Sequence, residues 1–176
     1  TIGLITEQGN RMTGTDILLD SAVVNQDSAT GVLNKKTVTD EATAAINLAN
    51  VAGCDHSMYL MVWDIDDFKQ VNDTYGHYFG DEVIKHLATE LNRAVANRGL
   101  VGRIGGDEFV IIQSSIGELE FHNRINRLQE YMKQDQISIS IGFLWKASCE
   151  NLEDMLKEAD HRMYEAKKAY YQTADR

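Results

Sequence analysis

The chain has 176 residues, which is enough for one domain with a sizeable hydrophobic core. Its 43% hydrophobic and 25% charged residues are typical of a globular protein. The formal net charge of -10 argues against binding of a nucleic-acid polymer, which needs a basic face. No apolar run approaches the ~20 residues of a membrane span, so we expect no membrane contact by this segment. Cys54 and Cys149 stand in no metal-binding spacing and indicate a reducing compartment.

The N-terminal part of the chain predicts a lead-in, a turn and a long helix. Residues 1–26 form the lead-in, within which the apolar spacing of residues 15–24 predicts a short helix. Asp27–Lys36 predicts a turn that leads into a helix. Thr37, with acids three and four residues later, resembles a capping box that opens this helix, and Gly53 suits its C-cap.

A strand with an acidic end comes next. Met58–Trp63 is a run of large apolar residues, which is typical of a strand buried on both faces. The run continues into Asp64-Ile65-Asp66-Asp67, where Asp64 and Asp66 share one face of the strand. Carboxylates are rarely buried without a partner, so this strand end indicates an unusual site.

The remaining helices follow from turn residues and apolar spacing. Residues 68–80 are polar and turn-rich, and Asp81 then opens a helix that ends at Gly99. Further spacing predicts a helix over residues 117–132, a strand over residues 137–144 and a last helix capped by Asn151. Helices that alternate with strands predict an α/β sandwich with a mixed central sheet.

Between these helices, Arg103–Ile112 predicts a β-hairpin. Its strands are residues 100–104 and 109–112, joined by a tight Gly105-Gly106 turn in which both glycines take positive φ. Asp107 and Glu108 stand at the exit of the turn. Taken alone, this pattern fits a solvated acidic hairpin tip equally well.

The two acidic strand ends become informative together. If Asp64, Asp107 and Glu108 converge, each pair at about 4 Å costs about 1 kcal/mol in water and roughly 4 kcal/mol at an effective dielectric of 20. A divalent cation would relieve this repulsion. Because every ligand is an oxygen, the set favours Mg²⁺ or Mn²⁺ over zinc.

These residues resemble one enzyme family. Gly105-Gly106-Asp107-Glu108-Phe109 is the GGDEF signature of diguanylate cyclases, which make cyclic di-GMP from two GTP. Other blocks resemble the family's motifs in the same order, and they are Asp27–Lys36, Asp64–His77 with Gly80-Asp81, Ser138–Gly142, and Ala159–Lys167. The resemblance implies a nucleotidyl-cyclase-like, palm-related sandwich over residues 27–172. It also implies that residues 1–26 are a lead-in or signalling helix.

The resemblance assigns roles to eleven residues. Asp107 and Glu108 are the catalytic pair, and Asp107 is the candidate acceptor of the hydroxyl proton. Two Mg²⁺ or Mn²⁺ ions are held by Asp64, the Ile65 carbonyl, Asp107 and Glu108. The substrate-binding residues are Asp67, Phe68, Lys69 and Lys167 for the phosphates, Asn72 and Asp81 for the guanine, and His77 near the substrate.

Three plainer interpretations stay open beside these roles. Asp66 is interpreted as a cap of the following turn. Asp81 fits an ordinary helix N-cap as well as a guanine reader. The segment Asp27–Lys36 is favoured as a structural turn over a support for the nucleotide pocket.

The chain departs from the family at two places. Where the family has an arginine one turn after Lys167, this chain has Tyr171, and a phenol cannot replace a guanidinium on phosphate. Where many relatives have Arg-x-x-Asp before the hairpin as an inhibitory product site, this chain has Ala96 and Gly99. We therefore predict no feedback inhibition through that site.

The resemblance also implies partners and a location. Each domain would bind one GTP, so the active form would be a homodimer, placed behind an upstream sensor domain. The chain begins without Met and is expected to be part of a longer cytoplasmic protein or of the cytoplasmic part of a membrane-anchored sensor. Two rival hypotheses are a degenerate GTP-binding module that regulates without turnover and a polymerase-like palm, which the lack of a basic track disfavours.

Overall fold

The structure is a computed structural model that describes residues 4–5, 11–12, 25–52, 58–95, 98–114, 117–146 and 151–174. The helix expected over residues 15–24, the C-cap at Gly53 and the position of Ala96 lie outside these residues. The elements in chain order are β1 (Leu4–Ile5), β2 (Arg11–Met12), β3 (Leu33–Asn34), α2 (Lys35–Ala52), β4 (Met58–Ile65), α3 (Phe68–Tyr75), α4 (His77–Val95), β5 (Gly99–Arg103), β6 (Glu108–Ser114), α5 (Glu118–Gln134), β7 (Ile139–Lys146) and α6 (Leu152–Ala174).

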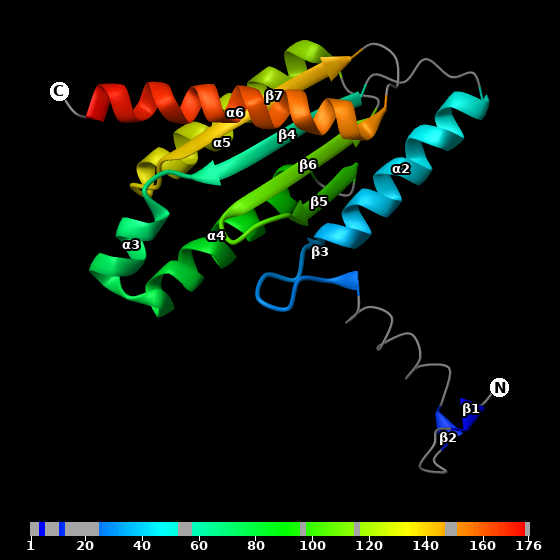
Figure 1. The fold of residues 1–176 in the computed structure, drawn as a ribbon, viewed down its shortest axis with the longest axis horizontal. Helices are drawn as coiled ribbons and strands as arrows, with labels where there is room; N and C mark the ends of the chain where they lie inside the picture. The colour runs from blue at the N-terminus through cyan, green and yellow to red at the C-terminus, as the bar shows by residue number, and fades with distance from the viewer. Residues whose placement is uncertain are drawn as a thin grey trace.

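A mixed five-stranded sheet organises the domain. Its strand order is β3-β5-β6-β4-β7, with β3 and β5 parallel and all other neighbours antiparallel. Helices α2 and α6 cover one face of the sheet, and α4 and α5 cover the other (Figure 1). The predicted α/β sandwich with a mixed sheet is therefore confirmed. Strands β1 and β2 pair with each other in a separate antiparallel ladder.

Each face of the sheet has its own hydrophobic core. Because successive residues of a strand point to opposite faces, β6 contributes to both. Phe109 and Ile111 pack under α4 and α5 together with Trp63, which is fully buried. Val110 and Ile112 pack under α2 and α6. Strands β4 and β6 are thereby held rigidly up to the ends that carry the acids.

The start of α2 differs from the prediction. The helix begins at Lys35, and the Asn34 side-chain oxygen accepts a hydrogen bond from the Thr37 amide at 2.9 Å. Asn34 is thus the capping residue and Thr37 lies inside the first turn, so the capping box at Thr37 was wrong. An asparagine immediately before the helix can reach a free amide of the first turn, which makes a second cap unnecessary.

The segment between β4 and α4 is helical rather than turn-rich. Phe68–Tyr75 forms α3, Gly76 breaks it with φ +89°, and α4 already begins at His77. Asp81 therefore lies inside α4, and its interpretation as an N-cap was wrong. Helix α4 ends at Val95, so Gly99 starts β5 instead of ending the helix. Phe68 packs against the core under α4, and this contact stabilises a helix that was not expected from the mostly polar sequence.

The hairpin forms as predicted, but with a wider turn. Arg103 pairs with Phe109, and the amides of Ile104 and Gly105 both donate to the Glu108 carbonyl, at 2.9 and 3.3 Å. Neither Gly105 nor Gly106 has a positive φ, so the predicted conformation of this pair was wrong. Gly105 instead gives space to the Glu108 side chain, which would have to shift because a Cβ there would lie 2.9 Å from its Oε2.

The C-terminal elements agree with the sequence more closely. Helix α5 follows Gly117, β7 begins two residues after its predicted start, and Asn151 caps α6 by accepting from the Glu153 amide at 2.8 Å. No helix within the described residues has the length and apolar character needed to cross a membrane.

Candidate active site

The acids of β4 and the hairpin meet at one end of the sheet. Asp64 on β4 lies directly opposite Glu108 on β6 in the antiparallel register, so the two side chains share one face. Asp107 precedes Glu108 at the mouth of the hairpin. Asp64 is only 6% exposed, which makes an uncompensated charge there costly. The structure thus brings Asp64 together with two adjacent acids that lie more than 40 residues later in the chain.

Lys167 of α6 provides the first compensation. Its ammonium donates a hydrogen bond to Asp64 Oδ2 and forms an ion pair with it. Burial disfavours the charged lysine, but the Asp64 carboxylate outweighs this and raises the pKa of Lys167. The other Asp64 oxygen, Oδ1, is buried with no hydrogen-bond partner among the described residues. One lysine therefore leaves the cluster incompletely neutralised.

The excess of negative charge affects both hairpin acids. Burial, followed by the neighbouring Asp64, raises the pKa of Asp107 to about 7. Burial also raises the pKa of Glu108, with further contributions from Asp64 and Asp160. An isolated carboxyl group titrates near pH 4, so this site holds its protons unusually tightly and would bind a cation in their place.

The chemistry of these residues suits a divalent metal ion. In the part of the chain that the structure describes, no three acidic or imidazole side chains are already gathered as a metal site. The unpartnered Asp64 Oδ1 nevertheless needs a positive partner, and the available donors are all oxygens. This donor chemistry suits Mg²⁺ or Mn²⁺.

A pocket of about 690 Å³ opens beside the acids. Its volume lies in the range of roughly 300–1,000 Å³ that is usual for small-molecule sites. Eight of the predicted site residues line it, and they are Ile65, Asp67, Phe68, Lys69, Asn72, His77, Asp107 and Lys167. Gln70, Asp73 and Tyr171 complete the wall. Of the other three predicted residues, Asp64 and Glu108 adjoin Asp107 as described above, whereas Asp81 is exposed on α4 and is not part of the wall.

Gly80 has a clear structural purpose next to this pocket. A Cβ at Gly80 would lie 1.8 Å from Asn72 Oδ1, so only glycine allows the Asn72 amide to rest against α4. This contact fixes the orientation of the Asn72 side chain, which brings two hydrogen-bond donors and one acceptor to the pocket wall. The polar end formed by Asn72 and His77 lies along α3 and the start of α4.

Asp66 has a different role from the predicted one. Its two carboxylate oxygens accept hydrogen bonds from the Ser140 hydroxyl at 2.5 Å and the Ser138 hydroxyl at 2.7 Å. Asp66 is 5% exposed and faces the start of β7 and the residue before it. The interpretation of Asp66 as a turn cap was wrong, because the strand register brings two serines to its carboxylate first. Asp66 anchors the end of β4 and so fixes Asp64 and Asp67 on either side.

Arg103 ties the hairpin turn to the N-terminal motif. Its guanidinium donates to the Gly106 carbonyl and, at 3.1 Å, to Asp27 Oδ2. Asp27 also accepts hydrogen bonds from the backbone amide and hydroxyl of Thr30. Burial would raise the pKa of Asp27, but these donors outweigh it and lower the pKa. The turn predicted at residues 27–36 therefore also supports the hairpin just before Asp107.

Comparison with known proteins identifies the architecture. The family model described as "Diguanylate cyclase, GGDEF domain" matches residues 24–172. The chain belongs to the GGDEF domain family.

Relatives of this GGDEF domain include signalling proteins. The probable diguanylate cyclase DgcC of Escherichia coli K12 is 33% identical over 153 residues, which cover 82% of this chain and 41% of DgcC. The response regulator PleD of Caulobacter vibrioides is 32% identical over 164 residues, which cover 86% of this chain and 35% of PleD. The chain thus spans less than half the length of these relatives.

A solved structure supports the same assignment of fold. The crystal structure of the GGDEF domain of DgcB from Caulobacter crescentus, in complex with c-di-GMP, matches with a TM-score of 0.76 at 27% identity. The match covers 82% of this chain and 91% of that chain.

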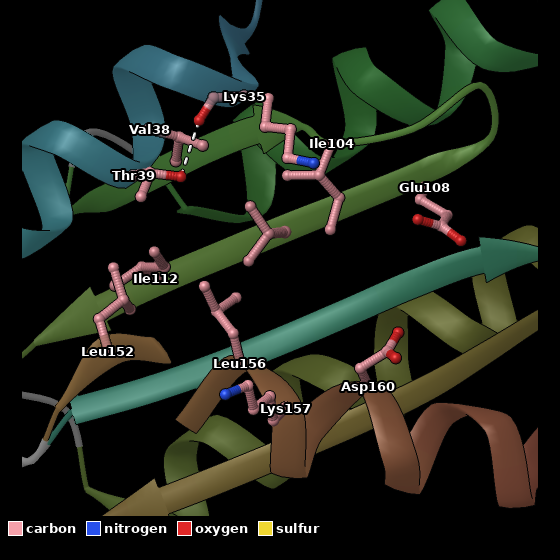
Figure 2. Close-up of a pocket in the computed structure, with 11 residues that line it drawn as sticks. Lys35, Val38, Thr39, Ile104, Glu108, Ile112, Leu152, Leu156, Lys157 and Asp160 are labelled. Atoms are coloured by element: carbon pink, nitrogen blue, oxygen red, sulfur yellow. Dashed lines mark hydrogen bonds between the residues drawn. The ribbon is translucent and has the colours of Figure 1, made fainter. Parts of the chain in front are cut away.

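The GGDEF domain has a second cavity, and Glu108 lines it. It measures about 260 Å³ and lies between α2, β6 and α6, with an aliphatic floor that includes Val110, Ile112 and Leu156. Figure 2 shows Asp160 from α6 directed toward Glu108, and Lys35 reaching into the same space from α2. Glu108 therefore lines this mostly apolar cavity, while its neighbour Asp107 lines the polar pocket.

Sequence reasoning missed several residues that act on this site. Asp160 and Lys35 both influence the charge of Glu108, and Tyr170 contacts Asp67. Asp160 and Lys35 belong to the motif blocks, so their place in the family pattern was a usable signal. Tyr170 departs from that pattern, and only the three-dimensional course of α6 reveals its contact.

Proposed function

We propose that this domain is a diguanylate cyclase, which condenses two GTP into cyclic di-GMP with release of pyrophosphate. The observation that carries the proposal is the register pairing of Asp64 with Glu108, which sets an incompletely neutralised acid cluster at the edge of the 690 Å³ pocket. Membership of the GGDEF family and relatives named as diguanylate cyclases support it.

The pocket residues divide between the two ends of GTP. In this proposal Asn72 and Asp81 read the guanine edge, and His77 lies near the base. Asp81 would have to turn from the surface of α4 toward the bound base. The amides at the start of α3, from Asp67 to Lys69, face the terminal phosphates, where a helix N-terminus favours negative charge. Lys69 and Lys167 add the positive charges.

The acids supply the reacting end of the site. Asp64, Asp107, Glu108 and the Ile65 carbonyl would hold two Mg²⁺ or Mn²⁺ ions, which favour ionisation of the 3′-hydroxyl and stabilise charge on the leaving oxygens. Asp107 accepts the proton of the attacking 3′-hydroxyl. A new O–P bond forms at the α-phosphate, the bond to the β-phosphate oxygen breaks, and pyrophosphate leaves. The step is repeated for the second bond of the cyclic product.

The reaction needs two copies of the domain. One pocket holds one GTP, so the 3′-hydroxyl of each nucleotide must meet the α-phosphate of the other across a homodimer. We further propose that residues 27–172 form this catalytic module and that residues 1–26 connect it to a sensor domain. A cytoplasmic location fits its GTP substrate.

The alternative function is a GTP-binding regulator without turnover. Tyr171 favours it, because this wall residue carries no positive charge for the phosphates. The presence of all three acids and of Lys167 favours the cyclase.

One incubation separates the two functions. The protein is mixed with GTP and Mg²⁺, and the products are resolved by chromatography, with Asp107→Asn as the matched variant. We expect cyclic di-GMP and pyrophosphate from the native protein and at least a hundredfold less from the variant, about 3 kcal/mol in the barrier. Tight GTP binding without cyclic di-GMP would establish the regulator, and equal turnover by Asp107→Asn would refute the proposed catalytic role.

A further inference from the structure

Asp67, between β4 and α3, has an unusual backbone conformation. Its φ of 54° and ψ of 26° lie in the left-handed region, which a residue with a side chain adopts at a cost. Asp67 occupies the N-cap position of α3, yet its carboxylate makes no capping hydrogen bond to the helix. The capping hydrogen bond that usually stabilises an aspartate at this position is missing. Another contact must therefore hold Asp67 in this conformation.

The carboxylate of Asp67 accepts a hydrogen bond from α6. Tyr170 donates its hydroxyl to Asp67 Oδ2 at 3.1 Å, across 103 residues of sequence. Three residues earlier on α6, Lys167 contacts Asp64. The last turns of α6 thus hold both ends of the short connection that runs from β4 into α3. Because Lys167 is fixed at one end, Tyr170 acts on the other end from a defined position.

The environment of Tyr170 suits a permanent donor. Burial, followed by the nearby Asp67 and Asp66, raises the pKa of the Tyr170 phenol, so the hydroxyl keeps its proton at neutral pH. The Tyr171 ring packs edge-on against the Tyr170 ring, with centroids 5.4 Å apart and planes at 72°. Tyr171 also lines the 690 Å³ pocket, whereas Tyr170 lines the neighbouring cavity behind Asp67. The tyrosine pair therefore forms part of the partition between these two cavities.

We infer that Tyr170 is a positioning residue, whose hydroxyl holds Asp67 in the left-handed conformation and so aims the first amides of α3 at the pocket. The Val71 amide donates to the Asp67 carbonyl at 2.9 Å, so a change at Asp67 passes directly into the first turn of α3. The identity of the ligand, a nucleoside triphosphate with its terminal phosphates at these amides, rests on the proposed function. Tyr170 itself touches no substrate.

The first test removes only the hydroxyl. Tyr170→Phe keeps the ring and its packing on Tyr171, and Tyr164→Phe, on an exposed tyrosine of the same helix, is the matched control. Hydrogen exchange of the Val71 amide, which donates to the Asp67 carbonyl, is followed by NMR without nucleotide. Loss of one partly exposed hydrogen bond to a carboxylate should speed this exchange about fivefold, while Tyr164→Phe changes nothing.

The second test measures binding of a non-hydrolysable GTP analogue with Mg²⁺. Tyr170→Phe should weaken the analogue by about fivefold and raise KM for GTP by a similar factor, with kcat unchanged. The decisive experiment repeats this in an Asp67→Gly background. Glycine adopts positive φ without strain, so Tyr170→Phe should then have less than about a twofold effect.

The outcomes separate this inference from the proposed function. Unchanged exchange in Tyr170→Phe, or an equal loss of analogue binding in the Asp67→Gly background, would overturn the positioning role. If exchange speeds up in Tyr170→Phe but neither protein binds the analogue, the positioning role stands and the proposed function fails.

Discussion

The two faces of the sheet are built differently, and the difference locates the chemistry. The face under α4 and α5 is closed by large side chains such as Trp63, Phe109 and Phe121, all nearly inaccessible to solvent. The face under α2 and α6 is closed only in part and keeps a 260 Å³ cavity beside Glu108. Strand β6 contributes to both faces, because Phe109 points to the α4/α5 side and Glu108 points to the α2/α6 side. We call the α4/α5 side the closed face, because its largest side chains pack directly on the sheet. We call the α2/α6 side the open face, because its cavity reaches the sheet residues Val110 and Ile112 and the acid Glu108.

The largest expected effect is on the open face. Asp64→Asn keeps the size of the side chain but removes the charge that pairs with Lys167 and would bind the metal ions. We expect the rate of cyclic di-GMP formation to fall by about a thousandfold, roughly 4 kcal/mol in the barrier. The rate is measured by chromatography, and the circular dichroism spectrum confirms that the variant is folded. A folded variant with native turnover would show that the open face is not the catalytic one.

A matched change on the closed face should have the opposite profile. Leu87 is fully buried under the sheet, and Leu87→Ala should lower the free energy of unfolding by about 2–5 kcal/mol. Leu156→Ala, beside the existing cavity on the other face, should cost less, about 1–2 kcal/mol, because that site is already loosely packed. Urea denaturation compares the two. Turnover per folded molecule should stay native in Leu87→Ala, and equal costs in the two variants would contradict the difference between the faces.

The charge on the open face should also make stability depend on pH. Without metal, the pKa of Asp107 is about 7 in the folded protein against 3.8 for a free aspartate side chain, so folding favours its protonated form. Its stabilising contribution is complete below about pH 4 and is lost as the pH rises through about 7. After allowance for solvent screening of this half-buried group, the loss is about 1–2 kcal/mol.

Urea midpoints of the metal-free protein at about pH 5 and about pH 8 measure this loss, with Asp107→Asn as the control that should remove it. Saturating Mg²⁺ should flatten the dependence, because the cation replaces the proton. A native protein whose pH dependence equals that of Asp107→Asn would show that the acids do not repel one another as described.

Sequence reasoning succeeded where one local pattern decided the structure. The apolar strand that runs into Asp64, the apolar strands of the hairpin and the Asn151 cap all follow from neighbouring residues, and the structure contains them. The faces of the long helices were visible in the spacing of their apolar residues. The meeting of Asp64 with Glu108 was considered as a condition, because each acid stands at one end of an apolar strand, and the structure contains it.

Sequence reasoning failed where partners come from distant segments. Helix α3 is short and mostly polar, with only Phe68, Val71 and Tyr75 at helical spacing, and its stability depends on Phe68 reaching the core under α4. Asp66 was misassigned because its serine partners are set by the register of β7, 72 and 74 residues away. The contact of Tyr170 with Asp67 depends on the length and direction of α6, which no local pattern specifies.

The smallest expected effect concerns the lack of a third cation on the open face. Tyr171 lines the pocket next to Lys167 and supplies no charge, so in the proposed function the phosphates would depend on two lysines and the α3 amides. Tyr171→Arg should bind GTP about fivefold more tightly, roughly 1 kcal/mol, since the side chain is 39% exposed and solvent weakens the new contact. Calorimetry with a non-hydrolysable analogue gives the affinity. Tyr164→Arg adds the same charge elsewhere on α6 and should leave the affinity native, which separates a local contact from a general attraction. If both arginine variants gain the same affinity for the analogue, the domain responds to net charge alone. Tyr171 would then not limit the affinity of the domain for the nucleotide.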